Sequence, residues 1–159
     1  MPPGLGRFSV VPAAYVYLLR EGASGTEVLL QLRHNTGFMD GHWAAAAAGH
    51  IEEGESAEQA ARRETAEEIG VTDAAVDFAT VLQRRHSEAP IDQRIDIFFT
   101  ARSWSGAPQR LEPQKSADLS WWPLAALPEP IPAHELFVLH HLAAGTLPPF
   151  VSLGFGHSD

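Results

Sequence analysis

The segment from Ser56 to Gly70 constrains the fold of this chain more than any other. Ser56 and Gln59 fit a capping box, in which the serine oxygen accepts the Gln59 N–H. Good helix formers follow until Gly70, a residue typical of the position just after a helix. The sequence therefore predicts a helix of about fourteen residues that ends at Gly70.

This predicted helix carries three glutamates on one face. Glu64, Glu67 and Glu68 are three and four positions apart, so their carboxylates project into one patch. At about 6 Å and an effective dielectric near 20, each like-charge pair costs roughly 2–3 kcal/mol. A divalent cation removes that cost, and oxygen ligands without histidine or cysteine favour Mg²⁺ or Mn²⁺ over Zn²⁺. The alternative is a solvated, glutamate-rich helix face.

The residues before the glutamates leave room for a neighbouring loop. Small side chains lie one and two turns earlier on the same face, at Ala57, Ala60 and Ala61. The loop from Gly49 to Glu55 can therefore approach the helix. Arg63 precedes Glu67 by four residues and can pair with Glu67 or with Glu55, which would hold the acids in place.

The rest of the chain predicts strands around this helix and a second helix. The predicted strands are Phe8–Arg20, Glu27–Arg33, the short apolar run Trp43–Ala48, Val76–His86, Arg94–Ala101 and Leu119–Pro123. The first two form a hairpin across the loop 21–26, and a longer loop, His34–His42, follows. Pro132 begins a helix whose leucines recur at helical spacing until Gly145. This order predicts an α/β sandwich.

Length and composition favour one domain over residues 1–159, with residues 1–6 and 148–159 as terminal arms without chemistry of their own. The net charge of −9 repels polyanions, so a nucleic acid polymer is not an expected partner. There is no cysteine, which excludes disulfides, thiolate metal sites and a cysteine nucleophile. With no signal peptide and no membrane-length apolar run, we expect a cytoplasmic protein that does not contact membranes.

The spacing from Gly49 to Val71 resembles the Nudix box. Gly49, five residues, Glu55, seven residues and then Arg63-Glu64-Thr65-Ala66-Glu67-Glu68-Ile69-Gly70-Val71 match it at every fixed position. Chance agreement at average residue frequencies has a probability on the order of 10⁻⁹ per window. One position departs, since Thr65 stands where the family usually has an aliphatic residue. The resemblance implies an α/β/α sandwich with a mixed sheet.

The resemblance also implies a reaction, the attack of water on phosphorus in a nucleoside diphosphate derivative, assisted by Mg²⁺ or Mn²⁺. It assigns Glu64, Glu67 and Glu68 to the metal, Arg63 to orienting them, and Glu55 to loop support or secondary ligation. Relatives often carry Pro-Gly-Gly where this chain has residues 46–49, so the carbonyl that reaches metal belongs here to Ala48.

Glu112 is the metal-ligand candidate outside the box. The run from Gly106 to Glu112 resembles a loop that carries an additional metal-binding glutamate in mutator-type members, and a solvated loop acid is the alternative. The general base differs between members of the family. It stays open here among Glu64, Glu67, Glu68, Glu112 and His86.

Substrate signals outside the box are sparse. The proline of ADP-ribose enzymes, the tyrosine of dinucleoside polyphosphate enzymes and the coenzyme A signature are absent, which leaves a nucleoside triphosphate or a modified one. Arg33 can meet a phosphate or sugar, and His134 lies where mutator-type members contact the base edge. Aromatic candidates for base stacking are Phe38, Trp43, Trp121 and Trp122. Asp92, Arg94 and Asp96 alternate and either line the cleft or mark an exposed strand.

Three other functions compete with this prediction. A nucleotide-binding regulator on the same fold would hydrolyse nothing, but such domains usually lose box acids, and all are present here. Isopentenyl diphosphate isomerase shares the fold but depends on a cysteine. A Nudix enzyme acting on a nucleotide sugar or another nucleoside diphosphate conjugate also fits. The sequence leaves open whether the chain forms a homodimer.

Overall fold

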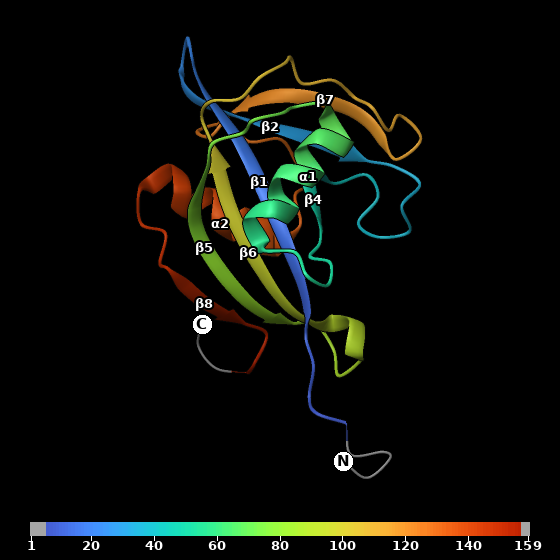
Figure 1. Ribbon diagram of the computed structural model, residues 1–159. Helices are drawn as coiled ribbons and strands as arrows, with labels where there is room; N and C mark the ends of the chain where they lie inside the picture. Colours follow the sequence, from blue (N-terminus) through green and yellow to red (C-terminus); the bar gives the residue numbers. More distant parts are fainter. Residues whose placement is uncertain (1–5, 157–159) are drawn as a thin grey trace.

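The computed structural model describes residues 6–156, which form a mixed β-sheet flanked by two helices (Figure 1). The elements in chain order are β1 (Val11–Gly22), β2 (Gly25–Arg33), β3 (Trp43–Ala45), β4 (Ala47–His50), α1 (Ala57–Ile69), β5 (Val76–Arg85), a short 3-10 helix (Pro90–Asp92), β6 (Gln93–Ala101), β7 (Ser116–Pro123), α2 (Ala133–Ala144) and β8 (Phe150–Leu153).

Strand β1 is the centre of the fold. It pairs with β6 in parallel along one edge, and on the other edge with β4 near its start and β2 near its end, both antiparallel. Beyond β6 the sheet continues with β5 and β8, while β2 also pairs with β3 and β7. Because β1 is covered on both faces, its sequence is a nearly continuous run of apolar residues.

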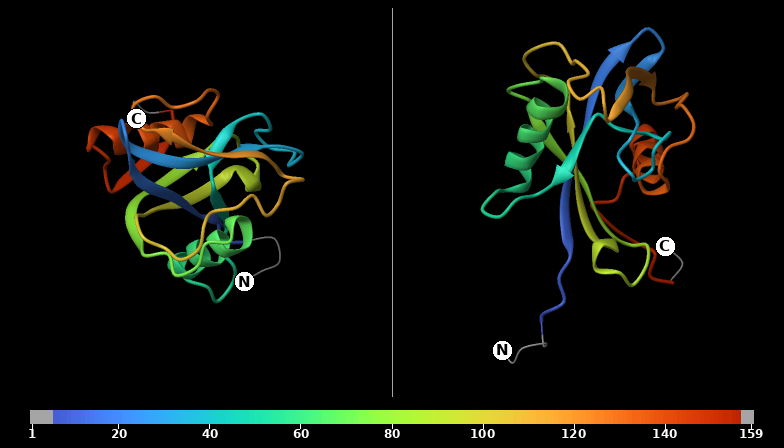
Figure 2. Two further views of the ribbon diagram at one scale, coloured as in Figure 1. Left: turned by 90° about the horizontal axis from the view of Figure 1, so that it is seen from above. Right: turned by 90° about the vertical axis from the view of Figure 1, so that its right-hand side faces the viewer.

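Alternate residues of β1 enter two separate cores. Ala14, Val16 and Leu18 pack with α1, while Tyr15 and Tyr17 and their neighbours pack with α2. The two helices lie on opposite sides of the sheet, as the right-hand view of Figure 2 shows. The predicted α/β/α sandwich with a mixed sheet is therefore confirmed.

Helix α1 forms as its sequence predicts. The Ser56 side chain accepts the Gln59 N–H and the Gln59 side chain accepts the Ser56 N–H, which completes the capping box. Gly70 ends the helix in the left-handed conformation, with φ of 69°. Thr65 is fully buried in place of an aliphatic residue, and its hydroxyl donates to the Arg62 carbonyl, so no polar group is left unpaired there.

Two predictions at the ends of elements were wrong. The segment 148–159 is not simply an arm, because Phe150–Leu153 forms β8, which pairs in parallel with β5. The adjoining Thr80 hydroxyl donates to the Pro148 carbonyl, which fixes the strand further. The hairpin loop is also shorter than predicted, since β1 reaches Gly22 and β2 starts at Gly25. Residues 1–5 and 157–159 of the predicted arms lie outside the described part.

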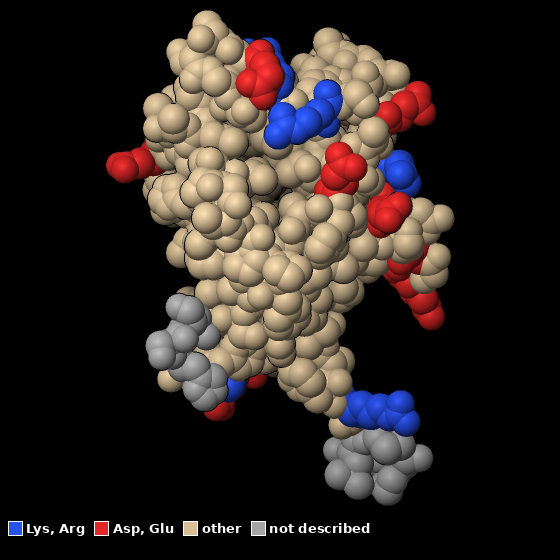
Figure 3. Space-filling view, turned by 90° about the vertical axis from the view of Figure 1, so that its left-hand side faces the viewer, with Lys and Arg blue, Asp and Glu red and all other residues tan. Residues whose placement is uncertain are grey.

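Charge is unevenly distributed over the surface. The face shown in Figure 3 carries few acidic or basic side chains across its centre, and those present gather in its upper part, along its right-hand edge and at its lower end. No helix within residues 6–156 has the length and apolar character needed to cross a membrane.

Glu135 is a buried carboxylate that joins α2 to the sheet. Its Oε1 accepts the Tyr17 hydroxyl at 2.7 Å and the Ala45 N–H at 2.8 Å. Burial raises the pKa of Glu135 to about 7, against the lowering effect of these two hydrogen bonds. A carboxyl group with a raised folded-state pKa stabilises the fold while protonated, and this contribution is lost as pH rises.

We therefore predict that Glu135→Gln changes the pH dependence of stability. The amide oxygen can accept both hydrogen bonds but cannot ionise. From about pH 4.5 to above pH 7, the free energy of unfolding of the wild type should fall by about 3 kcal/mol relative to the variant. Chemical denaturation across this range measures it, with the exposed Glu88→Gln as control. A constant difference would contradict the prediction.

Candidate active site

Arg63 holds the loop before α1 against the helix. Its Nε and Nη2 donate to the two carboxylate oxygens of Glu55, at 2.7 and 3.0 Å, and Nη2 also donates to the His50 carbonyl. Nη1 donates to Glu64 at 2.8 Å and to Glu67 at 3.3 Å. Both predicted pairings of Arg63 are therefore present, and one guanidinium links the loop to the acidic face.

Gly49 makes room for the Glu64 carboxylate. A Cβ atom on Gly49 would overlap Glu64 Oε1, so any larger residue would displace that carboxylate. The loop and helix can approach this closely also because Ala60 and Ala61 between them are small and fully buried. The Glu64 side chain is only 12% exposed, whereas Glu67, one turn further on, is 57% exposed.

Glu68 contacts the free edge of β4. Its Oε2 accepts the Ala48 N–H at 2.7 Å. Ala48 lies opposite Tyr15 of β1, and because its N–H points to Glu68, the pair is one that exchanges no hydrogen bonds. The N–H and carbonyl of such a residue point to the same edge, so the Ala48 carbonyl also faces away from β1. Ala48 has ordinary extended geometry, as a role for its carbonyl requires.

The loop after β6 brings Glu112 to the same place by capping α1. The N–H groups of Gln109 and Leu111 donate to the last carbonyls of the helix, those of Ile69 and Glu68. Gly106 lies against the Gly70 carbonyl and has φ of 89°, which favours glycine. This contact with the end of the helix positions Glu112.

These segments enclose a polar pocket of about 330 Å³. Its lining comprises Gln31, Arg33, Thr36, Ala48, Glu64, Glu67, Glu68, Glu112 and Lys115. The three helix glutamates, Glu112 and Ala48, predicted separately as metal ligands, are thus neighbours in space. Sequence reasoning missed Gln31, Thr36 and Lys115. Lys115 is the single lysine of the chain, a signal that was available in the composition.

Two carboxyl groups of the pocket, Glu64 and Glu68, have raised pKa values. Burial raises the pKa of Glu68 to about 8, the Ala48 N–H opposes the rise, and the carboxylates of Glu64 and Glu112 add to it. Burial also raises the pKa of Glu64, although Arg63 opposes this. The pKa of Glu55, in contrast, is lowered by its hydrogen bonds from Arg63. The charged forms of Glu64 and Glu68 are therefore disfavoured in this pocket unless a positive charge is added nearby.

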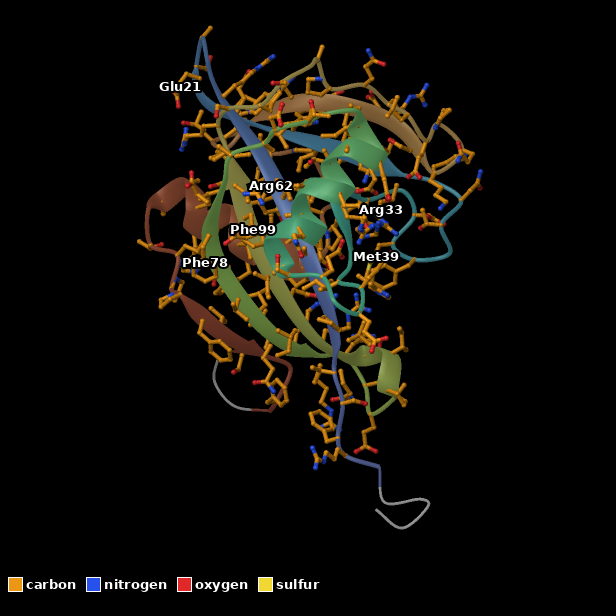
Figure 4. The ribbon with its side chains drawn as sticks, in the orientation of Figure 1. Glu21, Arg33, Met39, Arg62, Phe78 and Phe99 are labelled. Carbon is orange, nitrogen blue, oxygen red and sulfur yellow. The ribbon has the colours of Figure 1, made fainter. Side chains whose placement is uncertain are left out.

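Arg33 and Phe38 belong to one substructure beside the pocket. Arg33 Nε donates to the Phe38 carbonyl at 2.8 Å, its Nη2 donates to Thr36, and its guanidinium lies 5.7 Å from the Phe38 ring centroid. Figure 4 shows Arg33 between α1 and the loop that carries Met39. Arg33 lines the pocket, whereas Phe38 is 51% exposed and does not. Substrate binding by either residue stays a prediction.

Several other candidates lie away from the pocket lining. His86 is exposed beyond the end of β5, and Asp92 accepts a hydrogen bond from Ser87 in the next loop. The tryptophans pack against one another or against the cores: Trp43 on Trp122, and Trp121 on Trp104. His134, Arg94 and Asp96 lie together on the α2 side of the sheet.

Comparison with known proteins decides the family. The family model described as NUDIX domain matches residues 10–141. The chain belongs to the Nudix family. Membership confirms the class of enzyme that the box predicts, a hydrolase of phosphoanhydride bonds.

Solved Nudix structures share the fold. A MutT NUDIX hydrolase from Burkholderia pseudomallei is 23% identical with a TM-score of 0.73, covering 83% of this chain and 97% of that one. The NUDIX domain of Shewanella oneidensis NrtR, complexed with ADP ribose, is 22% identical with a TM-score of 0.71, covering 91% and 93%. A C. elegans Ap4A hydrolase in a binary complex is 23% identical with a TM-score of 0.63, covering 86% and 97%.

The donors of the Nudix pocket fit a hard divalent cation. The four glutamates and the Ala48 carbonyl offer only oxygen atoms, which are the ligands that Mg²⁺ and Mn²⁺ prefer. Within residues 6–156, however, no three histidine or acidic side chains already form a metal cage. One oxygen of each buried carboxylate is engaged, Glu64 Oε1 by Arg63 and Glu68 Oε2 by the Ala48 N–H.

We predict that Gly49→Ala impairs the Nudix site without unfolding the protein. The added Cβ displaces only the flexible end of Glu64, so stability should change by less than about 1 kcal/mol, while hydrolysis falls about 10²-fold because a ligand is misplaced. Gly22→Ala is a matched control, because its Cβ would displace the carboxylate of Glu27 in the distant hairpin. Equal activity in the two variants would contradict the role of Gly49.

Proposed function

We propose that this Nudix protein is a magnesium-dependent pyrophosphohydrolase of a nucleoside di- or triphosphate derivative. The observation that carries the proposal is the shared pocket, in which the box glutamates, Glu112 and the free edge of Ala48 meet two cationic side chains, Arg33 and Lys115. Manganese suits the same oxygen donors.

In this proposal Glu64, Glu67, Glu68, Glu112 and the Ala48 carbonyl hold the metal. Bound Mg²⁺ would neutralise the phosphates and lower the pKa of the attacking water. Arg63 orients Glu64 and Glu67 through its hydrogen bonds, and Glu55 holds Arg63 rather than facing the pocket. The general base is a glutamate of the pocket. His86, the remaining candidate, is exposed and outside it.

Arg33 and Lys115 are positioned to bind the phosphate chain. Arg33 is fixed by Phe38 and Thr36, and it presents a planar guanidinium suited to phosphate oxygens. Lys115 is exposed, and among residues 6–156 it forms no ion pair. Its carbonyl accepts the His34 N–H and its N–H donates to the Glu112 carbonyl, so its backbone joins both loops of the pocket.

The family and the pocket support a nucleoside diphosphate derivative as the substrate. A nucleoside triphosphate or modified triphosphate is the preferred substrate, and a nucleotide sugar or another conjugate is the alternative. A nucleotide-binding regulator without catalysis is the second function, and the likeness to the NrtR domain, which was cocrystallised with ADP ribose, supports nucleotide binding. The cytoplasmic location stays a prediction, and whether the chain forms a homodimer stays open.

Metal-dependent turnover tests the proposal. Mg²⁺ or Mn²⁺ should be required for hydrolysis of at least one nucleotide of a panel, and excess chelator should abolish it. Mg²⁺ should also raise the melting temperature of the wild type, because it binds only the folded pocket. Nucleotide binding without hydrolysis under all metal conditions would favour the regulator and overturn the enzyme.

Glu68→Gln should lower turnover by at least about 10²-fold while the fold survives. The amide oxygen can still accept the Ala48 N–H, and the carboxylate charge is lost. The stabilisation by Mg²⁺ should shrink in this variant. Glu58→Gln, on the exposed start of the same helix, is the control. Unchanged turnover would mean that Glu68 is structural.

Glu112 and Lys115 can be tested together at one loop. Glu112→Gln should raise the Mg²⁺ concentration needed for half-maximal activity, and Lys115→Ala should mainly raise KM, because it removes a phosphate contact. Gln114→Ala, between them and exposed, should behave as wild type. Magnesium titrations that coincide for the Glu112 and Gln114 variants would remove Glu112 from the metal site.

A further inference from the structure

A second polar cluster lies on the α2 side of the sheet. It consists of Tyr15 of β1, Arg84 of β5, Arg94 and Asp96 of β6, and His134 at the start of α2, and is called the Asp96 cluster below. Arg84 Nε donates to Asp96 Oδ2 and its Nη2 lies 3.5 Å from the Tyr15 hydroxyl, which lies 3.4 Å from His134 Nε2. None of these five residues lines the polar pocket of the candidate active site, which is called the acidic pocket below.

Two buried atoms of this cluster have no hydrogen-bond partner. Asp96 is fully buried, and its Oδ1 is unpaired although Oδ2 binds Arg84. Arg94 Nε is also buried and unpaired. An unsatisfied buried polar atom costs about 1–3 kcal/mol, and more when charged, so such atoms call for an explanation. Here a free acceptor and a free donor occur in the same cluster.

Donors outnumber free acceptors in the Asp96 cluster. Two arginines against one aspartate leave one net positive charge in a chain whose net charge is −9. Burial, followed by the charges of Arg84, Arg94 and Arg33, lowers the pKa of His134 to about 3, so the histidine adds no charge. The cluster therefore suits a neutral or anionic group that offers more acceptors than donors.

The cluster lies next to the acidic pocket across β4. The strand register pairs Asp96 of β6 with Ala13 of β1, and Ala13 with His50 of β4. Two strand spacings, about 10 Å, therefore separate the backbone of Asp96 from that of His50. His50 joins the two sites, because its carbonyl accepts from Arg63 while its ring Nε2 lies 3.5 Å from Arg94 Nη2. One nucleotide can therefore reach from the phosphate site to the cluster.

We propose that the Asp96 cluster binds the base of the substrate and selects a carbonyl–NH–carbonyl edge, as in uracil and thymine. This inference rests on the proposed nucleotide hydrolase. Asp96 Oδ1 accepts the central N–H, and Arg84 and Arg94 donate to the flanking carbonyls. Adenine and cytosine offer an amino group beside a bare ring nitrogen, and guanine offers one carbonyl and two donors. Each of these bases would place one of its own hydrogen-bond donors opposite an arginine N–H, which is also a donor, so neither group would find an acceptor.

The Arg94 side chain can move away from Asp96 with the loss of only weak hydrogen bonds. Its remaining contacts are long, 3.4 Å from Nη1 to the Ile91 carbonyl and 3.5 Å to His50. The rim of the cluster is accessible, since His50 is exposed and Arg94 and His134 are half-buried. A base can therefore enter by displacing Arg94, without disturbing the Arg84–Asp96 pair.

Binding of nucleoside monophosphates in magnesium buffer tests the proposal without requiring hydrolysis. Calorimetry should show that the wild type binds UMP at least about tenfold more tightly than CMP, AMP or GMP. Asp96→Asn should reduce or invert the UMP preference over CMP, because its amide N–H can face the bare ring nitrogen of cytosine. Thermal unfolding of the same samples shows whether the variant is folded.

A second variant keeps the buried ion pair intact. Arg94→Gln should weaken UMP binding about tenfold or more and leave the melting temperature close to wild type. Arg85→Gln is the control: Arg85 follows Arg84 in β5, is half-buried beside Glu88 and lies outside the cluster, so this variant should bind as wild type does. Three results would overturn the proposal: equal binding of all four monophosphates, no UMP binding at millimolar concentration, or a preference for another base. The unpaired atoms of the cluster would then be explained by hydrogen bonds to ordered water. Selective UMP binding without metal-dependent turnover would instead overturn only the hydrolase.

Discussion

The guanidinium of Arg63 is the interaction on which the active site depends. It binds Glu55 through two hydrogen bonds, contacts Glu64 and Glu67, and holds the loop through the His50 carbonyl. A charged, planar donor can satisfy several carboxylates at once, which a lysine cannot do in a fixed geometry. The loop is thereby close enough for Gly49 to lie against Glu64. Arg63 contacts only two of the four pocket glutamates, Glu64 and Glu67, whereas the magnesium site proposed above uses all four.

Strand β1 keeps two chemically different sites apart. It is buried on both faces, so α1 and the acidic pocket form on one side, and α2 and the Asp96 cluster form on the other. Strand β4 covers only the first part of β1 and leaves its own outer edge free for Glu68. The acidic site and the cationic cluster therefore meet around one short strand. In the proposed function, the metal-bound phosphate chain would lie at the acidic site and the base at the cationic cluster.

Sequence reasoning was most successful where the interactions are local. The capping box, the end of α1 at Gly70 and the pairing of Arg63 with Glu67 involve residues a few positions apart, so spacing alone defines them. It was less successful at the chain end and in the hairpin, because β8 forms only by pairing with β5, which is distant in the sequence. The same limit applies to Lys115, an ordinary surface residue until the pairing of β2 and β7 brings it beside Arg33.

The sequence by itself determined the family and the acidic helix face, because both follow from residue types at fixed helical spacing, and the prediction of Mg²⁺ or Mn²⁺ rests on the same residues. Only the tertiary structure decided that Glu112 shares the pocket, since the cause is a loop whose N–H groups satisfy the last carbonyls of α1. It also decided that Asp96 is buried beside two arginines. Alternating charges along a strand fit an exposed face equally well, and only the packing of β6 between β1 and β5 removes the water.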